Sequence, residues 1–587
     1  MSIRTKIICT IGPACNTIEK MMELLEAGMN VARLNFSHGT QEEHLISIQN
    51  LKEARRRLGK PMAIMLDTKG PEIRIGKIKG GIINLQAGQQ LFLTSEDIEG
   101  DEYRVNVHPG NLLQKLTEGT KILFDDGYIS SHVVKIEPNG VIIEFDNSGN
   151  LKSGKGANIP NVELGLPAFT EKDIEDICFG CLQDIDIIAA SFVRSPDHVL
   201  AIKNLLAREK KPEILVIAKI ENSEGVRNFD GILQVADGIM IARGDLGVEV
   251  PLSEVPRLQK MMIRKCYLAG KASVTATQML ESMIHNPRPT RAEVSDVANA
   301  IYDSTSAVML SGETAVGKYP LETVNVMKSI IKEAEGDFEY RDFFDLHGRT
   351  TYHDVPSAVT LATVKTAYSS NAKAIFAFTS GGSTARLLSR LRPSMPIIAM
   401  TPNEKCYHQM ASNWGVIPFL GDNIQSLLEG FDKISQFALA RSLVSYGDLV
   451  VVTAGSPFGI SGTTNMMLVE SIGDVLVRGE YGVGRKIYGN VVLVLSPESR
   501  PVYEVRGQLM VIAKCDESYL PLIQESAGVI LQNHVADEQS EHVLLEAAKS
   551  MDKPVLVRAD AASRALKEGQ LVTLDPGKAL VYKGVVI

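Results

Sequence analysis

The chain has 587 residues, of which 44% are hydrophobic and 22% charged, with a formal net charge of −9. A chain of this length exceeds what one hydrophobic core supports, so we expect about three or four domains. The acidic balance excludes a general nucleic-acid or membrane-surface binder, whose footprint would be basic. No apolar stretch is long enough to span a bilayer, and no signal-like leader is visible. We therefore expect a cytoplasmic protein without nucleic-acid or membrane partners.

The first 345 residues repeat one unit: an apolar, β-branched run, a polar residue at its end, and a helical stretch. The runs are almost continuously hydrophobic, which is typical of parallel strands covered on both faces. Eight such units predict an α/β fold of the (β/α)₈ TIM barrel type, formed by residues 1–70 and 168–345. The eight runs are Lys6–Gly12, Val31–Ser37, Ala63–Lys69, Asp186–Phe192, Leu215–Glu221, Gly238–Asp245, Ser273–Met279 and Ala307–Glu313.

Three further segments flank or interrupt the predicted barrel. Residues 71–167 contain short strands separated by Gly, Asn and Asp turns, which predicts a small β-barrel domain inserted at the barrel rim. Residues 356–475 resume as alternating strands and helices and predict an α/β C domain. Residues 482–587 show further alternation and predict an extra C-terminal domain.

Polar side chains stand at the C-terminal ends of the predicted strands, where barrel enzymes carry their active sites. Glu221 and Asp245 offer two carboxylates on neighbouring strand ends, an oxygen-only donor set that suits Mg²⁺ or Mn²⁺. Lys219 precedes Glu221 by two residues, so both side chains point to one face, and its charge suits a transferring phosphoryl group. The polar strand ends are Asn35, Ser37, Asp67, Thr68, Ser191, Lys219, Glu221, Arg243, Asp245, Thr277, Ser311 and Glu313.

A second oxygen-rich cluster carries only one formal charge, which suits a monovalent cation. Its residues are Asn35, Ser37, Asp67 and Thr68. Arg33 and Arg74 add guanidinium groups, which can bind phosphate oxygens through two parallel hydrogen bonds.

The segment from Thr379 to Thr384 follows a predicted strand and opens a helix expected to begin near Ala385. Hydroxyls and free backbone N–H groups at such a position form an anion cradle. The sequence predicts an anion-binding site at this position, with Thr379, Ser380, Ser383 and Thr384 as its residues.

Long motifs, in order along the whole predicted barrel, resemble the pyruvate kinase family. They include AGMNVARLNFSHG (27–39), LDTKGPEIR (66–74), AKIEN (218–222), ARGDLGVE (242–249), ATQMLESM (276–283) and MLSGETA (309–315). The resemblance implies phosphoryl transfer from phosphoenolpyruvate to ADP, giving ATP and pyruvate, the last step of glycolysis. It also implies Mg²⁺ (or Mn²⁺) and K⁺ as cofactors and a homotetramer. The resemblance further implies that Thr379, Ser380, Ser383 and Thr384 form the effector site, at which a sugar phosphate or a nucleotide exerts allosteric control.

Carried over residue by residue, the resemblance assigns roles at the rim. It implies that Lys219 stabilises the transferring phosphoryl group and that Arg33 binds the substrate phosphate. The remaining implied roles are Mg²⁺ ligation by Glu221 and Asp245, K⁺ ligation by Asn35, Ser37, Asp67 and Thr68, carboxylate contacts by the Gly244 backbone and the Thr277 hydroxyl, and nucleotide contacts by Arg74 and Lys155. Glu72 matches the K⁺-dependent members, and Thr277 lies on the face where the enolate is protonated.

The resemblance also exposes departures. The family usually has Pro-Val where this chain has Ala272-Ser273, and Asp-Gly-x-Asp where it has Asp303-Ser304-Thr305-Ser306. The extra C-terminal segment resembles the swivelling phosphohistidine domain of phosphoenolpyruvate-utilising enzymes. However, His542 lacks the Ala pair of that motif, so we expect an exposed helix residue and no phosphoryl carrier.

Two other functional classes are consistent with parts of the pattern. Mg²⁺-dependent aldolases and lyases of phosphoenolpyruvate and pyruvate also pair Glu and Asp on barrel strands, but lack the monovalent-cation cluster and the inserted domain. A non-enzymatic metabolite sensor would be expected to lose Lys219, Glu221, Asp245 or Thr277, and all four are present. Formation of ATP distinguishes a kinase from both.

Overall fold

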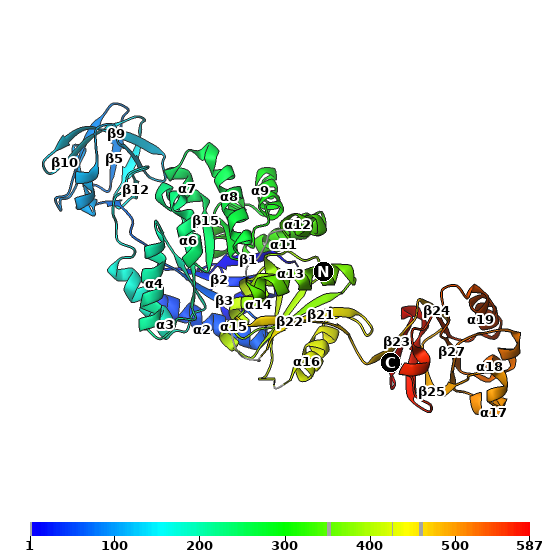
Figure 1. Cartoon of the computed structure of the whole chain (residues 1–587). Coiled ribbons are helices and arrows are strands. Elements are labelled where there is room, and N and C mark those ends of the chain that lie inside the picture. Colours follow the sequence, from blue (N-terminus) through cyan, green and yellow to red (C-terminus); the bar gives the residue numbers. More distant parts are fainter. Residues whose placement is uncertain (1–2, 349–353, 425, 457–461, 587) are drawn as a thin grey trace. The chain divides into compact units, whose positions relative to one another are not determined.

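The computed structural model describes residues 3–348, 354–424, 426–456 and 462–586 (Figure 1). The chain divides into two compact units. The first comprises Met1–Val364, Ala377–Gln425 and Thr453–Met466, and the second comprises Lys365–Phe376, Ser426–Val452 and Met467–Ile587. Among the described residues, no helix is long and apolar enough to cross a membrane.

Eight parallel strands close into a barrel in the order β1-β17-β16-β15-β14-β13-β3-β2, as the sequence predicts (Figure 1). The register sets Asn35 opposite Asp67 and Ala190 opposite Ala218, so the strand ends meet at one rim. The strands are β1 (Lys6–Thr10), β2 (Met29–Asn35), β3 (Ala63–Asp67), β13 (Ile187–Ala190), β14 (Leu215–Ile220), β15 (Gly238–Ala242), β16 (Ala272–Ala276) and β17 (Ala307–Leu310).

All eight predicted strands end one to three residues earlier than expected, and in two of them this moves a carboxylate from the strand end into a helix. Asp245 lies in helix α7 (Arg243–Glu249), and Glu313 lies in helix α10 (Gly312–Ala315). Because β15 and β17 stop at Ala242 and Leu310, both carboxylates are carried by the first turn of a helix that follows the strand.

Helices surround the barrel, and several begin with a capping box, in which a Thr hydroxyl and an acidic side chain satisfy two backbone N–H groups. Thr40 pairs with Glu43 in this way, and Thr290 pairs with Glu293. A barrel interior of buried apolar side chains, among them Ile8, is separate from the larger core between strands and helices. The outer helices are α1 (Ile18–Ala27), α2 (Gln41–Leu58), α3 (Glu171–Leu182), α4 (Pro196–Arg208), α6 (Phe229–Val235), α8 (Val255–Leu268), α9 (Arg291–Tyr302) and α11 (Pro320–Gly336).

The inserted β domain is a seven-stranded sheet, in the order β12-β8-β9-β10-β6-β7-β4, with a two-stranded ribbon of β11 and β5. An isolated bridge between Arg74 and Gly156 joins the two ends of this order, and the Ile75 N–H bonds to the Lys155 carbonyl over 3.0 Å. The strands are β4 (Arg74–Ile75), β5 (Ile82–Leu85), β6 (Gln90–Thr94), β7 (Arg104–His108), β8 (Lys121–Phe124), β9 (Ile129–Glu137), β10 (Gly140–Phe145), β11 (Gly149–Lys152) and β12 (Ala157–Asn158). The segments that enter and leave the domain are thus bonded to each other.

The α/β segment that follows alternates helices and strands. Its strands are β18 (Ala374–Phe378), β19 (Ile397–Thr401), β20 (Val416–Leu420), β21 (Leu449–Gly455) and β22 (Thr464–Ser471). Its helices are α13 (Val355–Ser369), which precedes β18, and α14 (Ser383–Ser389), α15 (Glu404–Gln409) and α16 (Leu427–Ala440). Strands β19 and β20 pair in parallel along their full length. Helix α14 begins at Ser383, two residues before its predicted start.

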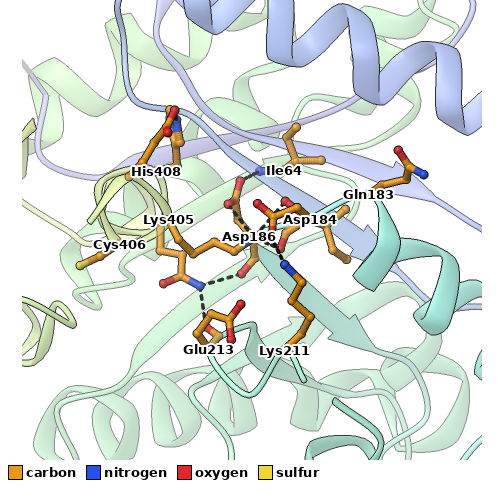
Figure 2. Close-up of polar contacts among 12 residues, drawn as sticks. Ile64, Gln183, Asp184, Asp186, Lys211, Glu213, Lys405, Cys406 and His408 are labelled. Atoms are coloured by element: carbon orange, nitrogen blue, oxygen red, sulfur yellow. Dashed lines mark hydrogen bonds and ion pairs between the residues drawn. The ribbon is translucent and has the colours of Figure 1, made fainter. Parts of the chain in front are cut away.

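Helix α15 directs polar side chains toward the N-terminal ends of the barrel strands (Figure 2). Lys405 Nζ donates to the Asp184 carbonyl over 2.9 Å and lies 3.6 Å from the buried Asp186 carboxylate. His408 Nδ1 accepts the Met62 N–H over 3.3 Å. These contacts fix α15 against the barrel face opposite the polar rim.

The last segment forms an eight-stranded sheet in the order β23-β30-β29-β25-β26-β27-β28-β24. Strand β23 pairs with β30, so this sheet begins before the boundary expected at residue 482. The strands are β23 (Val475–Arg478), β24 (Tyr481–Val483), β25 (Ile487–Leu493), β26 (Leu509–Ile512), β27 (Gly528–Leu531), β28 (Val555–Val557), β29 (Leu571–Asp575) and β30 (Leu580–Lys583). His542 lies on α19 (Glu538–Met551) with a 73% exposed side chain, as an ordinary surface helix residue would.

Candidate active site

Lys219 lies near the end of β14 among acceptors from three strands. Its Nζ is 3.0 Å from Asp67 Oδ1, 2.7 Å from Ser191 Oγ and 3.0 Å from Glu221 Oε1. Burial lowers the pKa of Lys219, but the carboxylates of Asp67 and Glu221 outweigh that effect and hold the pKa above its ordinary value. The site therefore presents a fixed, buried ammonium group.

Asp67 joins Lys219 to the first arginine of the site. Arg33 Nε donates to Asp67 Oδ2 over 2.6 Å, and the same guanidinium donates to Thr10 Oγ over 2.9 Å. Asp67 is fully buried; burial raises its pKa, but Arg33 and Lys219 together hold it below the ordinary value. One ionised carboxylate thus holds two cations side by side at the rim.

Glu221 and Asp245 form a buried carboxylate pair beside Lys219. Burial and the Asp245 charge raise the pKa of Glu221 to about 7, against the opposing effect of Lys219. Burial, together with Asp126 and Glu72, raises the pKa of Asp245. Two carboxyl groups that resist ionising together suit an oxygen-binding divalent cation, which would favour both charged forms.

No group of three or more His, Cys, Asp or Glu side chains lies in metal-binding arrangement anywhere in the described ranges. A two-carboxylate set leaves coordination positions for water and substrate oxygens, as Mg²⁺ sites commonly do. The donor chemistry of this carboxylate pair therefore fits Mg²⁺.

The expected monovalent-cation residues come together at the ends of β2 and β3. Asn35 Oδ1 accepts the Ser37 N–H over 3.2 Å, and Thr68 Oγ accepts the Ser191 N–H over 3.1 Å. With Asp67 as its only charged member, the cluster is rich in oxygen and low in charge, which fits K⁺ better than a divalent ion.

Gly244 and Thr277 contact each other across two strand ends. The Gly244 N–H donates to Thr277 Oγ over 2.9 Å, and that hydroxyl donates to the Ala276 carbonyl over 2.6 Å. Thr277 and Gln278 have φ angles of 66° and 55°. A β-branched residue in the left-handed region is strained, and such strain clusters at functional sites.

A cleft of about 390 Å³ is lined by residues of the barrel and the β domain, including Glu72, Arg74, Lys155 and Asp245. Arg74 Nε donates to Glu72 Oε2 over 2.6 Å, and Lys155 forms an ion pair with Asp125. The structure therefore brings both expected nucleotide-contact residues into one cleft with Asp245, a member of the carboxylate pair.

Two residues of this region have contacts that the sequence did not predict. The sequence identified Ser191 only as a polar residue at a strand end, yet its hydroxyl oxygen accepts a hydrogen bond from Lys219. Arg194, on the cleft wall, donates to the carbonyls of Leu166 and Pro167, in the segment returning from the β domain. The only sequence signal for both is the polar run that follows β13.

A separate cavity of about 220 Å³ lies in the α/β segment and is lined by all four residues of the expected effector site. Thr379 Oγ accepts the Gly382 N–H over 2.9 Å, and Thr384 Oγ lies 2.7 Å from Thr464 Oγ. Asp422 contributes the acidic side chain among the described lining residues. The sequence also predicts a second loop, Gly455–Asn465, facing this site, and its residues 457–461 lie outside the described residues.

Known proteins similar to this chain agree with that geometry. A family model described as "Pyruvate kinase, barrel domain" matches residues 2–324, and one described as "Pyruvate kinase, alpha/beta domain" matches residues 357–470. A protein named "Pyruvate kinase" from Geobacillus stearothermophilus is 44% identical over 587 residues, covering 100% of this chain and 99% of the relative. Proteins of the same name from Bacillus licheniformis and Staphylococcus aureus are 43% and 42% identical over 584 residues, covering 99% of both chains in each case.

Proposed function

The chain belongs to the pyruvate kinase family, and on that basis we propose that it transfers the phosphoryl group of phosphoenolpyruvate to ADP, giving ATP and pyruvate in the cytoplasm. The arrangement of Lys219 among Asp67, Ser191 and Glu221 is the observation that carries the proposal. It supplies a preorganised cation at the rim where charge would develop on a moving phosphoryl group.

The side chains of the site divide the work between binding and charge stabilisation. Arg33, held by Asp67 and Thr10, faces the substrate phosphate, and Lys219 stabilises the phosphoryl group in flight. The Gly244 N–H and the Thr277 hydroxyl orient the substrate carboxylate, for which they exchange their present mutual bond. Thr277 stands on the face where the product enolate takes up a proton.

Glu221 and Asp245 would hold Mg²⁺ (or Mn²⁺), and Asn35, Ser37, Asp67 and Thr68 would hold K⁺. When bound, these cations neutralise charge on the phosphoryl and carboxylate oxygens of the substrate. Arg74 and Lys155 approach the nucleotide phosphates from the β domain, whose closure over the rim excludes water. Glu72 belongs with the K⁺-dependent form of the site, since no lysine occupies its position.

We also propose that the cavity lined by Thr379, Ser380, Ser383 and Thr384 binds a phosphorylated effector, and that the enzyme assembles as a homotetramer. Four hydroxyls on one cavity wall offer several donors to phosphate oxygens, which supports an anionic ligand. Coupling of such a ligand to the active site would typically change substrate affinity by about 5- to 150-fold.

A lactate dehydrogenase-coupled assay with phosphoenolpyruvate, ADP and Mg²⁺ tests the proposal. We expect pyruvate formation to rise strongly when K⁺ replaces a tetraalkylammonium ion at equal ionic strength. Activity indifferent to K⁺ would leave the kinase reaction standing and remove the roles of Glu72 and the Asn35–Thr68 cluster. Folded protein that forms no pyruvate or ATP with K⁺, Mg²⁺ and a sugar phosphate present would overturn the proposed reaction.

A further inference from the structure

A small cavity at the opposite end of the barrel from the active site is lined by four cationic side chains, Lys271, Arg386, Arg390 and Arg392. Within the described ranges, no acidic side chain lines it. Its accessible space is about 10 Å³, which is room for one water-sized atom. A basic cavity of this size has the dimensions and charge to admit a small acceptor and nothing larger.

Arg392 is the deepest of the four cations, with an exposure of only 2%. Its terminal nitrogens donate to neutral oxygens: the Ser389 carbonyl over 3.0 Å, the Ser304 carbonyl over 2.8 Å and Ser306 Oγ over 2.9 Å. The guanidinium carbon lies 4.6 Å from the centre of the Trp414 ring. Nε is buried and has no hydrogen-bond partner in the described part of the chain.

Among the residues that the structure describes, no carboxylate forms an ion pair with the buried guanidinium of Arg392. Burial lowers its pKa to about 9, and Tyr340 and Glu335 offset only part of that effect. Glu335 is already engaged, because its oxygens accept the backbone N–H groups of Arg4 and Thr5. An unpaired buried cation is costly, so a counter-charge at this position would be strongly favoured.

Ser306 marks where a counter-charge is missing. The family resemblance implies an aspartate at this position, where this chain has a serine. In this chain Ser306 instead exchanges side chain-to-backbone bonds of 3.2 Å with Ser273, the other departure. Ser306 Oγ accepts from Ser273 and from Arg392, so its own proton is left to donate.

We propose that this cavity binds the acceptor atom of a small inorganic anion, which supplies the negative charge that an aspartate at position 306 would otherwise provide. Nε of Arg392 and the hydroxyl of Ser306 are its proposed donors, and Arg386 and Arg390 also line the cavity. The anion thereby ties the N-terminal ends of β16 and β17 to the end of α14.

Thermal unfolding of the full-length protein tests this site at constant ionic strength with sodium chloride, sodium phosphate, or the bulky anion 2-(N-morpholino)ethanesulfonate. Because a ligand that binds only the folded state stabilises it, the midpoint is expected to rise by about 2 °C or more with the binding anion. A rise in chloride and phosphate identifies a site that admits a single atom. A rise in phosphate alone identifies an oxyanion with one oxygen in the cavity.

Ser306→Asp is the decisive variant, since it builds the counter-charge into the chain and should abolish the dependence on anion. Ser306→Asn is the matched control, since it has nearly the same size without the charge and should keep the dependence. If chloride raises the midpoint, crystals of the wild-type protein grown in sodium bromide should show an anomalous peak beside Arg392 Nε. No rise of the midpoint in either chloride or phosphate, or equal anion dependence in wild type and Ser306→Asp, would overturn the proposal.

Discussion

Lys219 and Ser191 fix each other at neighbouring strand ends, with 2.7 Å between Nζ and Oγ. The Ser191 hydroxyl donates a hydrogen bond to the Thr68 carbonyl over 2.6 Å, so its lone pairs face the ammonium. Lys219 is therefore positioned by the backbone immediately after β3 as well as by the carboxylates. The orientation of this flexible side chain is set before substrate arrives.

Ser191→Ala should lower kcat by about 10- to 100-fold, because it frees one of the three bonds that hold Lys219 and small misplacements are costly in rate. The Michaelis constant for phosphoenolpyruvate should change much less, since Arg33 keeps its own partners. Steady-state kinetics check this, with Ser191→Thr expected to recover activity and exposed Ser47→Ala as a control. An unchanged kcat in Ser191→Ala would remove the positioning role.

Lys219→Met should lower the rate of phosphoryl transfer by about 10²–10³-fold or more, because it removes a preorganised charge at the reacting group. The fold should persist, since Asp67 keeps its ion pair with Arg33. Quenched-flow measurement of ATP formed in one turnover checks the transfer, and circular dichroism checks the fold. Near-normal transfer in a folded Lys219→Met protein would contradict the assignment.

His408 should make the protein less stable as the pH falls below about 6.5. Its side chain is 6% exposed, and burial lowers its pKa to about 3, so protonation is favoured in the unfolded state. The exposed Glu404 carboxylate, 3.8 Å away, does not offset this burial. The contribution is present above the unfolded pKa and is lost, by up to about 1.4 kcal/mol per pH unit, as the pH falls toward the folded value.

His408→Asn keeps an acceptor for the Met62 N–H without a titratable ring. Comparing urea unfolding of the two proteins between pH 6.5 and 4.5 isolates the histidine, because other groups with shifted pKa values in this range, such as Glu221, are common to both proteins. We expect the wild-type protein to lose about 1–2 kcal/mol more than the variant across this range. Parallel curves would show that His408 does not titrate differently on unfolding.

Ser383→Asp should abolish the response to a phosphorylated effector, because it places a fixed negative charge on the wall of the proposed effector cavity. The ratio of the phosphoenolpyruvate Michaelis constants with and without fructose 1,6-bisphosphate, and likewise AMP, should fall to one in the variant. Ser445→Ala, outside that cavity, is the control. A variant that still responds like wild type would place the effector elsewhere.

The barrel was predictable because parallel strands buried on both faces leave a strong apolar signal, and polar residues such as Lys219 and Glu221 follow each run. Asp245 shows where this reasoning failed. The sequence analysis extended the apolar run Gly238–Ala242 as far as the carboxylate of Asp245, whereas the chain turns into α7 at Arg243. A strand and the first turn of a helix are not distinguishable over so few residues.

Pairings between distant residues were beyond the sequence. Ser191 and Lys219 are 28 positions apart and meet only through the register of β13 and β14. The contact of Ser306 with Arg392 spans 86 positions and joins a barrel strand to the end of α14. Both departures from the family pattern were visible in the sequence, but that Ser273 and Ser306 bond each other depends on β16 and β17 being neighbours.

The bridge between Arg74 and Gly156 has a consequence for substrate entry. Arg74 and Lys155 stand on the two segments that connect the β domain to the barrel, and these segments are bonded to each other. Rotation of the domain would carry both cations as a single rigid pair. A bound nucleotide would thus gain or lose contact with two positive charges in one motion. Under the roles proposed for Arg74 and Lys155, admission of ADP and shielding of the reaction from water would be a single event in the catalytic cycle.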